Sequence, residues 1–249
     1  QSVWMAAGLP SEAFSVAEDH QERPELCLVL GGDGTLLAAA RRYGHLGVPL
    51  LGINLGSLGF LTAHGVEEAQ DVVELYFQNR LRRELRHALD VSLVREGRVL
   101  TRHSALNDAV LNKGALARII EFQLRIDGFD AASIRADGLI VATPTGSTAY
   151  SLSAGGPILH PALDAWVVSP ICPHSLTLRP MVVPSDLEMS ITVGATDEAH
   201  LTLDGQIEYP LQPGDRVELS RSSQHITLLQ NPALPFFRVL QQKLHWNTR

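Results

Sequence analysis

The hydrophobic and polar positions divide the chain into two parts with different periodicity. In the first part, continuous apolar runs at 26–30 and 48–53 predict strands that are covered on both faces. Between them, a glycine turn at 31–34 precedes an Ala-, Leu- and Arg-rich stretch at 35–43, which predicts a helix that stops near Gly44. Strand, turn, helix and strand in this order form a βαβ unit, so we expect the two strands to be parallel neighbours.

Farther along, the chain completes the first part and then changes to the pattern of the second. A glycine loop at 54–61 and a segment with apolar residues at helical spacing, 66–78, complete the first part. From about residue 89 to 230 the pattern changes to short alternating runs, which predict a mainly β region. A final segment at helical spacing, 235–246, is expected to pack back on the first part. Three residue pairs typical of hairpin turns or strand ends interrupt the β region: Glu96-Gly97, Asp127-Gly128 and Asp204-Gly205.

Composition and charge narrow the possible partners. At 249 residues, with 45% hydrophobic and 19% charged residues, the chain has material for one large or two small domains. The net charge of −7 argues against a nucleic-acid or anionic-membrane surface, which needs a basic excess. No apolar run has the length of a membrane span, no basic-then-apolar leader is present, and the two cysteines are too few for a disulfide framework. We therefore expect a cytoplasmic protein.

The most informative segment is 143–157, in which almost every residue is small, hydroxylated or glycine. It contains a single aromatic residue, Tyr150, and it follows an apolar strand-like run at 139–142. A core has little use for so many hydroxyl groups, because each buried one needs a hydrogen-bond partner. A loop that touches a polyhydroxylated, phosphorylated ligand uses them well, so the segment predicts a ligand-binding loop.

The glycine turn at 31–34 contains one acidic residue, Asp33. Glycines let the backbone approach a ligand, and the following helix amides face an anion. An acid in a phosphate cradle makes sense if it accepts a hydrogen bond from a hydroxyl nucleophile, or meets phosphate through a metal ion. Alternatively, Asp33 only caps the helix in a tight turn. The spacing alone leaves both interpretations open, and the turn is neither a Walker loop nor a full dinucleotide fingerprint.

Other polar residues are candidates with equally ordinary alternatives. Adjacent Asn107 and Asp108 lie in an apolar run, so at least one is expected to be buried and to need a ligand, a bulge or an edge position. Arg135 could bind phosphate and Asp137 could accept a hydrogen bond, or the two could pair with each other. Asp204 resembles any hairpin-turn residue. The ten histidines show no metal-ligand spacing, and there is no Gly-x-Ser-x-Gly elbow.

In their order and rough spacing, the segments 31–35, 107–108, 135–138, 143–157 and 204–206 resemble the NAD kinase family. The resemblance covers the chain from about Leu26 to the tail. Its first motif, Gly-Gly-Asp-Gly-Thr, is shared with diacylglycerol, sphingosine and phosphofructo-kinases, whereas the long run is specific. The resemblance implies transfer of the γ-phosphoryl group of ATP to the adenosine ribose 2′-hydroxyl of NAD.

The same resemblance implies a fold of class α/β + β. A truncated Rossmann-like α/β domain at 1–84, with the tail 232–249 packed back on it, is followed by a β-rich, sandwich-like NAD-binding domain at 85–231. Family members usually begin with a further strand before the glycine motif, and none is recognisable in the residues that precede Leu26. The resemblance also implies a homodimer or homotetramer, and Mg²⁺ or another divalent cation carried by the donor phosphates.

The resemblance assigns roles by position. Asp33 is the expected catalytic base near the 2′-hydroxyl, Asn107 and Asp108 contact the adenosine half, and Asp137 contacts the nicotinamide end. Asp108 replaces a frequent Glu. Arg135 stands where donor preference varies, and an arginine there favours ATP over polyphosphate. The full set expected to bind NAD is Asp33, Gly34, Phe60, Asn107, Asp108, Arg135, Asp137, Thr148, Ala149, Tyr150 and Ser153. The residues expected near the donor phosphates are Gly31, Gly32, Thr35, Asp204 and Gln206.

Two other functions remain open from the residues. A lipid kinase of the diacylglycerol or sphingosine type shares the first motif, but it should carry an apolar acyl groove or a basic membrane-facing patch, and the sequence shows neither. A non-catalytic dinucleotide sensor could have the same pocket. The presence of Asp33 argues against a sensor, and binding of NAD without conversion would favour it.

Overall fold

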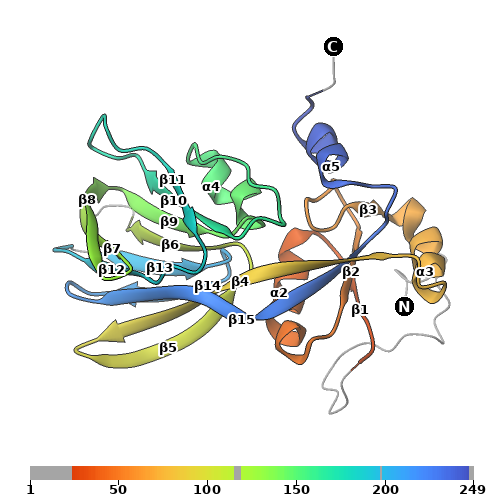
Figure 1. Cartoon of the computed structure of the whole chain (residues 1–249), viewed down its shortest axis with the longest axis horizontal. Coiled ribbons are helices and arrows are strands. Elements are labelled where there is room, and N and C mark those ends of the chain that lie inside the picture. The colour runs from red at the N-terminus through yellow and green to blue at the C-terminus, as the bar shows by residue number, and fades with distance from the viewer. Residues whose placement is uncertain (1–23, 115–118, 197, 247–249) are drawn as a thin grey trace. The chain divides into compact units, whose positions relative to one another are not determined.

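The computed structural model describes residues 24–114, 119–196 and 198–246, and the chain divides into two compact units (Figure 1). Unit 1 is formed by Gln1–Leu85 with His225–Arg249, and unit 2 by Arg86–Gln224. The chain passes from one unit to the other within two long strands, β4 (Arg82–Arg95) and β15 (Arg216–Gln230). The domain boundaries expected from the sequence, at 84/85 and 231/232, stay predictions. The expectation about a missing first strand concerns residues that lie almost entirely outside the described ranges.

Unit 1 is an α/β layer built on a short parallel sheet. Its elements are β1 (Cys27–Leu30), α2 (Asp33–Tyr43), η2 (Gly44–Leu46), β2 (Leu50–Asn54), β3 (His64–Gly65), η3 (Val66–Glu68), α3 (Ala69–Phe77) and α5 (Phe236–Lys243). Strand β1 pairs in parallel with β2, with Cys27 opposite Leu50, as the predicted βαβ unit requires. Strand β2 also pairs in parallel with β3 and with the end of β15.

The helices of unit 1 cover the sheet with their apolar sides. Helix α2 buries Leu36, Leu37 and Ala40. It comes close to β2 at Gly52, where an added Cβ would lie 2.9 Å from Leu36 Cδ1. Helix α3 contributes to an apolar cluster of unit 1 that also contains Ile53 of β2. The predicted tail helix is present as α5, which begins after Pro235 and is shorter than the expected segment.

Unit 2 is almost entirely antiparallel β-structure. Besides β4 and β15 it contains β5 (Arg98–Ala105), β6 (Asp108–Lys113), β7 (Ile120–Ile126), β8 (Phe129–Ala136), β9 (Gly138–Ala142), η4 (Gly146–Thr148), α4 (Tyr150–Ser153), β10 (Ala165–Ile171), β11 (Met181–Pro184), β12 (Met189–Val193), β13 (Ala199–Leu203) and β14 (Ile207–Leu211). Among the described residues of this unit, one sheet has the order β15-β12-β7-β8 with β4 and β5 added at β15, and the other has the order β11-β10-β9-β6-β13-β14.

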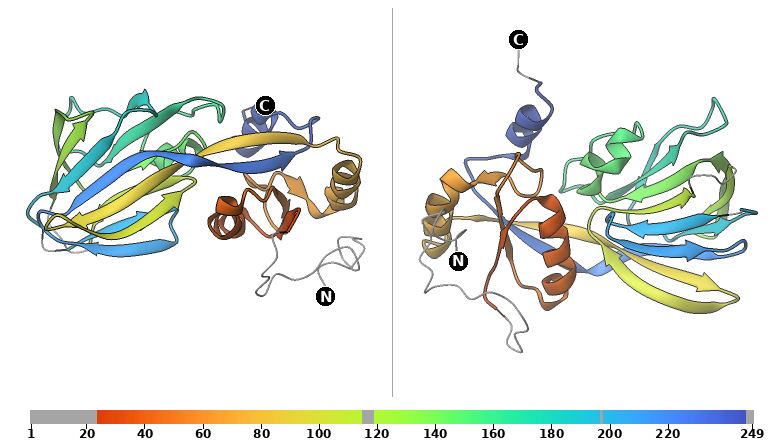
Figure 2. Two further views of the ribbon diagram at one scale, coloured as in Figure 1. Left: turned by 60° about the horizontal axis from the view of Figure 1, so that its bottom comes forward. Right: turned by 180° about the vertical axis from the view of Figure 1, so that it is seen from behind.

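The two sheets of unit 2 face each other as layers of a sandwich (Figure 2). Their inner faces share one apolar cluster, which includes Phe122 of β7 and Trp166 of β10, both fully buried. Strand β7 alternates strictly between buried apolar and exposed polar side chains, because only one of its faces is covered. The expected α/β plus β-rich sandwich fold is therefore confirmed.

A second apolar cluster lies on the other face of the β9 sheet. Ile140 of β9 and Val167 of β10 pack there with Leu159, which belongs to the segment that follows the long hydroxyl-rich run. Helix α4 lies on the same side (Figure 1). This packing fixes the start of the run at the end of β9, as the apolar stretch at 139–142 predicts.

The turns follow their sequence signals, but two strands do not follow the expected lengths. Residues with positive φ occupy the three predicted turns: Glu96-Gly97, Asp127-Gly128 and Asp204-Gly205. Strands β4 and β15 have 14 and 15 residues, whereas the sequence predicts only short runs. Both strands continue from one unit into the other, so their side chains meet different surroundings along their length and no single alternation extends through them.

No described helix combines the length and the apolar character that crossing a membrane requires.

A partly buried ion pair, in which only the carboxylate is fully enclosed, joins the end of β4 to the turn before β15. The Asp215 side chain is 1% exposed and accepts hydrogen bonds from Arg95 Nε (2.8 Å) and from a second guanidinium nitrogen (2.8 Å). Burial alone raises the pKa of Asp215, but Arg95 and the backbone N–H of Gln212 outweigh it and hold the pKa below its usual value. We expect Arg95→Met to lower the free energy of unfolding by about 3 kcal/mol at pH 7, because it leaves a buried carboxylate unpaired.

The stability that the lowered pKa contributes is fully present above the unfolded-state pKa of aspartate, about 3.9, and is lost as the pH falls through the lower folded-state pKa. Urea unfolding of the wild type and Arg95→Met should therefore differ at pH 7 and converge in acid. Arg125→Met is the matched control, since Arg125 and Asp130 are both exposed and their pair contributes about 0–1 kcal/mol. An equal loss in both variants would contradict the assignment.

Candidate active site

The glycine turn after β1 opens directly into α2 at the carboxyl end of a parallel strand. Asp33 is the first residue of α2, and Gly32 and Gly34 beside it are exposed. The first amides of a helix have no partner within it, so this end of α2 favours an anionic group. Ligands of open α/β sheets bind outside the carboxyl ends of the strands. The turn is therefore a candidate phosphate-binding element.

The described hydrogen bonds of the half-buried Asp33 side chain all lead away from its own helix. Its carboxylate instead accepts four hydrogen bonds from the segment that precedes β3. Oδ1 accepts bonds from the N–H of Leu61 (3.1 Å), the N–H of Thr62 (2.9 Å) and the Thr62 hydroxyl (2.9 Å). Oδ2 accepts one from the N–H of Phe60 (2.8 Å). Oδ1 therefore accepts three of these bonds and Oδ2 only one, so within the described residues Oδ2 is the oxygen with capacity left for a ligand.

The loop around Asp33 leaves no room for larger side chains. A Cβ at Gly59 would lie 2.0 Å from Asp33 Oδ1 and 2.4 Å from the Thr62 hydroxyl, so only glycine fits there. The Thr62 hydroxyl also accepts a hydrogen bond from Nδ2 of buried Asn54 at 2.9 Å. Asn54 in turn accepts a bond from the N–H of Gly56 at 2.7 Å. A continuous hydrogen-bonded network therefore fixes the direction of the Asp33 carboxylate.

Sequence reasoning missed Asn54, Gly59 and Thr62 as parts of this site. A signal for Asn54 was available, because a polar residue ends the buried strand β2 just before a glycine loop. Asp33 shows the same arrangement after β1. Residues at the carboxyl ends of neighbouring parallel strands meet at one edge of the sheet, so the two signals could have been combined. Thr62 had no comparable signal.

Phe60 connects this loop to the tail helix. Its partly buried ring lies beneath the Lys243 ammonium of α5, with 5.6 Å between Nζ and the ring centroid. Such a cation–π contact stabilises exposed sites by about 0.5–1 kcal/mol. The contact places a positive charge on the loop that donates to Asp33, and no sequence pattern indicates it.

Unit 2 has a hollow of about 350 Å³ at the ends of β6 and β13. Residues expected to bind NAD line it from distant parts of the chain: Asn107, Asp108, Ala149 and Tyr150. Asp204 and Gly205 of the β13–β14 turn also line it, together with Val110, Asn112 and Thr202. The structure thus brings three of the motifs into one place. Asn107 itself precedes β6. It does not lie within the strand, although the apolar run had suggested that it would.

The Asp204 carboxylate holds the backbone of the Asn107–Asp108 turn. It accepts hydrogen bonds from the N–H of Leu106 (3.1 Å), Asn107 (2.7 Å) and Asp108 (3.3 Å). Asp204 is only 8% exposed. The sequence favoured an ordinary hairpin turn here. The structure shows that this turn also holds the backbone of Asn107 and Asp108 in place.

The Asp108 carboxyl lies in the same hollow and is only 4% exposed. Burial first, and the charge of Asp204 second, raise the pKa of Asp108 to about 7. Asn107 Oδ1 is also buried and has no hydrogen-bond partner among the described residues. Near pH 7 the hollow therefore offers one carboxyl group that is about half ionised. It also offers one amide oxygen that accepts no hydrogen bond from the described residues.

The hydroxyl groups of the long run have two different uses. Thr143 donates to Leu106 O at 2.6 Å, and Ser147 donates to Pro144 O at 2.6 Å and accepts from Leu159 N at 2.9 Å. These buried groups hold the loop in shape, and that the loop binds a ligand stays a prediction. Among the residues expected to bind NAD, Tyr150 and Ser153 are exposed and Thr148 is half-buried.

The remaining predicted residues do not line the hollow. Arg135 is exposed on β8, and its backbone oxygen accepts a hydrogen bond from His174 N. Asp137 pairs with Lys113 at 3.1 Å, so Arg135 and Asp137 do not form the pair that the sequence left open. Gln206 is exposed in the β13–β14 turn. Gly31, Gly32, Gly34 and Thr35 lie with Asp33 in unit 1.

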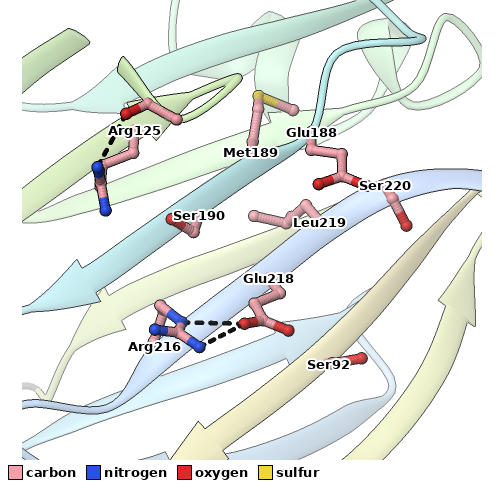
Figure 3. A pocket seen from close by; sticks show the side chains of 10 residues that line it. Ser92, Arg125, Glu188, Met189, Ser190, Arg216, Glu218, Leu219 and Ser220 are labelled. Carbon is pink, nitrogen blue, oxygen red and sulfur yellow. Dashed lines mark hydrogen bonds and ion pairs between the residues drawn. The ribbon is translucent and has the colours of Figure 1, made fainter. Parts of the chain in front are cut away.

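Two further observations limit the chemistry. Within the ranges that the structure describes, no three His, Cys, Asp or Glu side chains are grouped so that they could hold a metal ion. A second hollow of about 400 Å³ lies over β7, β12 and β15 (Figure 3). It is lined by none of the predicted site residues, and two of its charged residues, Arg216 and Glu218, pair with each other.

Family models match both parts of the chain. The model described as the ATP-NAD kinase N-terminal domain matches residues 11–81, and the one described as the ATP-NAD kinase C-terminal domain matches residues 106–231. Curated relatives match over nearly the whole of this chain. An NAD kinase of Koribacter versatilis is 48% identical over 251 residues, covering 100% of this chain and 87% of the relative. An NAD kinase of Acidobacterium capsulatum is 47% identical, covering 98% and 87%.

Solved structures give the same result. A yeast NADH kinase complexed with NADH superimposes with a TM-score of 0.84 at 32% identity, covering 92% of this chain and 68% of that one. An NAD kinase from Archaeoglobus fulgidus in complex with ATP superimposes with a TM-score of 0.75 at 28% identity, covering 89% and 83%.

Proposed function

The chain belongs to the NAD kinase family, and from this premise we propose that it transfers the γ-phosphoryl group of ATP to the 2′-hydroxyl of the adenosine ribose of NAD, giving NADP. One observation carries the proposal beyond the family match. The Asp33 carboxylate is fixed by four hydrogen bonds at the carboxyl end of β1, and its Oδ2 retains capacity for one more. This is the arrangement that a base needs to orient a hydroxyl nucleophile.

In the proposed reaction Asp33 accepts a hydrogen bond from the ribose hydroxyl at Oδ2. The oxygen–phosphorus bond to the γ-phosphorus forms as the bond to the ADP oxygen breaks, and the proton passes to Asp33. Phosphoryl transfer has a loose transition state, so alignment and charge stabilisation matter more than early deprotonation. The hydrogen-bonded loop supplies alignment, because Asp33 cannot rotate without losing several bonds.

In the proposed complex, groups of unit 1 supply the positive electrostatic potential at the donor phosphates. The exposed amides at the start of α2 favour anions, and Lys243 adds a charge beside the Phe60 ring. The described residues do not fit a metal site made by protein groups alone, since no three metal-binding side chains gather. We therefore place Mg²⁺ on the ATP phosphates, where it would offset their charge when bound.

The dinucleotide contacts are assigned to unit 2. Asn107 Oδ1 is buried without a donor, which suits an amino group such as that of adenine. The exposed Tyr150 ring at the same hollow suits stacking on a base. Asp108, Thr148, Ala149 and Ser153 complete this half in the proposal, and Asp137 is assigned to the nicotinamide end. Arg135, exposed on β8, is assigned to a preference for ATP over polyphosphate.

We assign the protein to homodimers or homotetramers and to the cytoplasm on the family resemblance. A lipid acceptor is not favoured, because the relatives that match over nearly the full chain are NAD kinases. A dinucleotide sensor is not favoured either, because a sensor has no need for the fixed Asp33 carboxylate.

The direct test is an incubation of the purified protein with NAD, ATP and MgCl₂. Product is detected by an NADP-specific dehydrogenase, and parallel samples contain polyphosphate in place of ATP or NADH in place of NAD. We expect NADP only when donor and MgCl₂ are both present, with ATP the better donor. Saturable binding of NAD with no NADP formed would instead support the sensor.

A further inference from the structure

The β13–β14 turn contains a carboxylate whose described hydrogen bonds run to a distant part of the chain. Asp204 lies in the left-handed region, with φ 51°, and is buried. Its side chain accepts three hydrogen bonds, at 2.7 to 3.3 Å, from successive backbone amides of Leu106, Asn107 and Asp108. Its own N–H donates to Asp108 O at 3.0 Å. Four hydrogen bonds thus fix the Asn107–Asp108 turn against β13.

The three amides that converge on Asp204 stabilise its ionised form, as they do in an anion-binding nest. The neighbouring Asp108 carboxyl is in the opposite position. It is buried, faces the negative charge of Asp204, and has its pKa raised to about 7. The hollow therefore holds one carboxylate that is stabilised by three backbone amides and one carboxyl whose charge changes near neutral pH.

The surroundings of Asp108 contain few other charges. Within the described residues, the titratable side chains that line the hollow are Asp108 itself, Asp204 of the β13–β14 turn and Tyr150 of α4. The neighbouring strands contribute uncharged groups, Asn112 from β6 and Thr202 from β13. Among these groups, the Asp204 carboxylate is the charge that acts on the Asp108 carboxyl.

We propose that Asp204 is a positioning residue for the dinucleotide: it holds the backbone that presents Asn107 and Asp108 to the hollow, and its charge acts on the Asp108 carboxyl beside it. The inference rests on the proposed binding of NAD in unit 2. It assigns the Asp204 position to the dinucleotide and not to the donor phosphates.

NAD binding in the hollow should depend on pH. Ionised Asp108 accepts hydrogen bonds from ligand hydroxyl or amino groups, and protonated Asp108 loses part of that capacity. As the pH falls through about 7, a growing share of the protein is therefore less able to bind NAD. If only the ionised form binds well, the apparent Kd for NAD rises about tenfold between pH 8 and pH 6, in proportion to the loss of the competent form.

The test measures NAD binding by titration calorimetry between pH 5.5 and 8.5 without ATP, together with kcat and the KM for NAD in the full assay. Asp204→Asn keeps the size of the side chain but removes its charge, so the pKa of Asp108 should fall. We expect the midpoint of the Kd curve to move to lower pH, the Kd at pH 8 to rise several-fold through weaker backbone bonds, and kcat to stay within about twofold. Asp108→Asn should flatten the curve.

Asp186→Asn is the matched control, because it removes one exposed charge from unit 2 and should leave the curve unchanged. An Asp204→Asn curve with the wild-type midpoint overturns the inference. A wild-type Kd that stays constant from pH 6 to 8 overturns the inference as well. This measurement does not depend on the folding of any variant. Wild-type protein that neither binds NAD nor forms NADP contradicts the proposed function instead, so the two failures are distinguishable.

Discussion

Replacement of Asp33 by asparagine should lower kcat by about 10²–10⁴, the contribution of a positioned general base, while the fold and NAD binding remain. Asparagine has the same shape, and its amide oxygen can still accept the three hydrogen bonds that reach Oδ1. Its amide nitrogen would replace Oδ2 and face the Phe60 N–H without a bond. The loss in stability should be about 1 kcal/mol, whereas the ribose hydroxyl loses its proton acceptor entirely.

The measurement is kcat at saturating NAD and ATP, with the Kd for NAD determined separately by calorimetry. Asp71→Asn is the matched control, since Asp71 is an exposed acid at the start of α3 in the same unit and should leave kcat unchanged. An Asp33→Asn enzyme with kcat within twofold of the wild type would show that Asp33 is not the base.

The second large effect is expected for Gly146→Ala, at the start of the hydroxyl-rich loop. An added Cβ would lie 2.0 Å from the backbone oxygen of Asn107 and 2.4 Å from its carbonyl carbon. These are backbone atoms, so no rotamer change can relieve the clash. Asn107 could move only by breaking its bonds to Thr143 N and to Asp204. We expect the Kd for NAD to rise at least about tenfold and the stability to fall by about 1–3 kcal/mol.

Gly128→Ala separates general destabilisation of unit 2 from damage to the site. Gly128 has φ +77° in the β7–β8 turn and nothing within 4 Å of an added Cβ, so alanine there causes only backbone strain, about 1–2 kcal/mol. The two variants should lose similar stability in urea unfolding, but only Gly146→Ala should bind NAD weakly. Equal Kd values for the two variants would refute the role of Gly146.

The fold could be predicted well where local signals agree. The apolar runs around the 31–34 turn predict β1, α2 and β2, because a buried parallel strand and a helix have different periodicity. The turn pairs at 96–97 and 127–128 predict two hairpins, since each ends in a glycine, which readily adopts the positive φ that such turns require. The length of β4 and β15 could not be predicted, because each passes from one unit to the other.

The site was less predictable, because its hydrogen bonds connect residues that are distant in sequence. The four donors to Asp33 come from residues 60–62, and no pattern indicates which loop a carboxylate will meet. The bonds of Asp204 likewise reach back about a hundred residues. In the 143–157 run, hydroxyl content alone does not distinguish groups that hold the loop, such as Ser147, from those that remain available to a ligand.

The most direct test of the central claim is a crystal structure of the protein with NAD bound. We expect the adenosine ribose 2′-oxygen to lie about 2.6–3.2 Å from Oδ2 of Asp33, within hydrogen-bond range of a base. A complex in which that oxygen lies beyond hydrogen-bond range of Asp33, or is held by another carboxylate, would contradict the assignment of Asp33 and the reaction built on it.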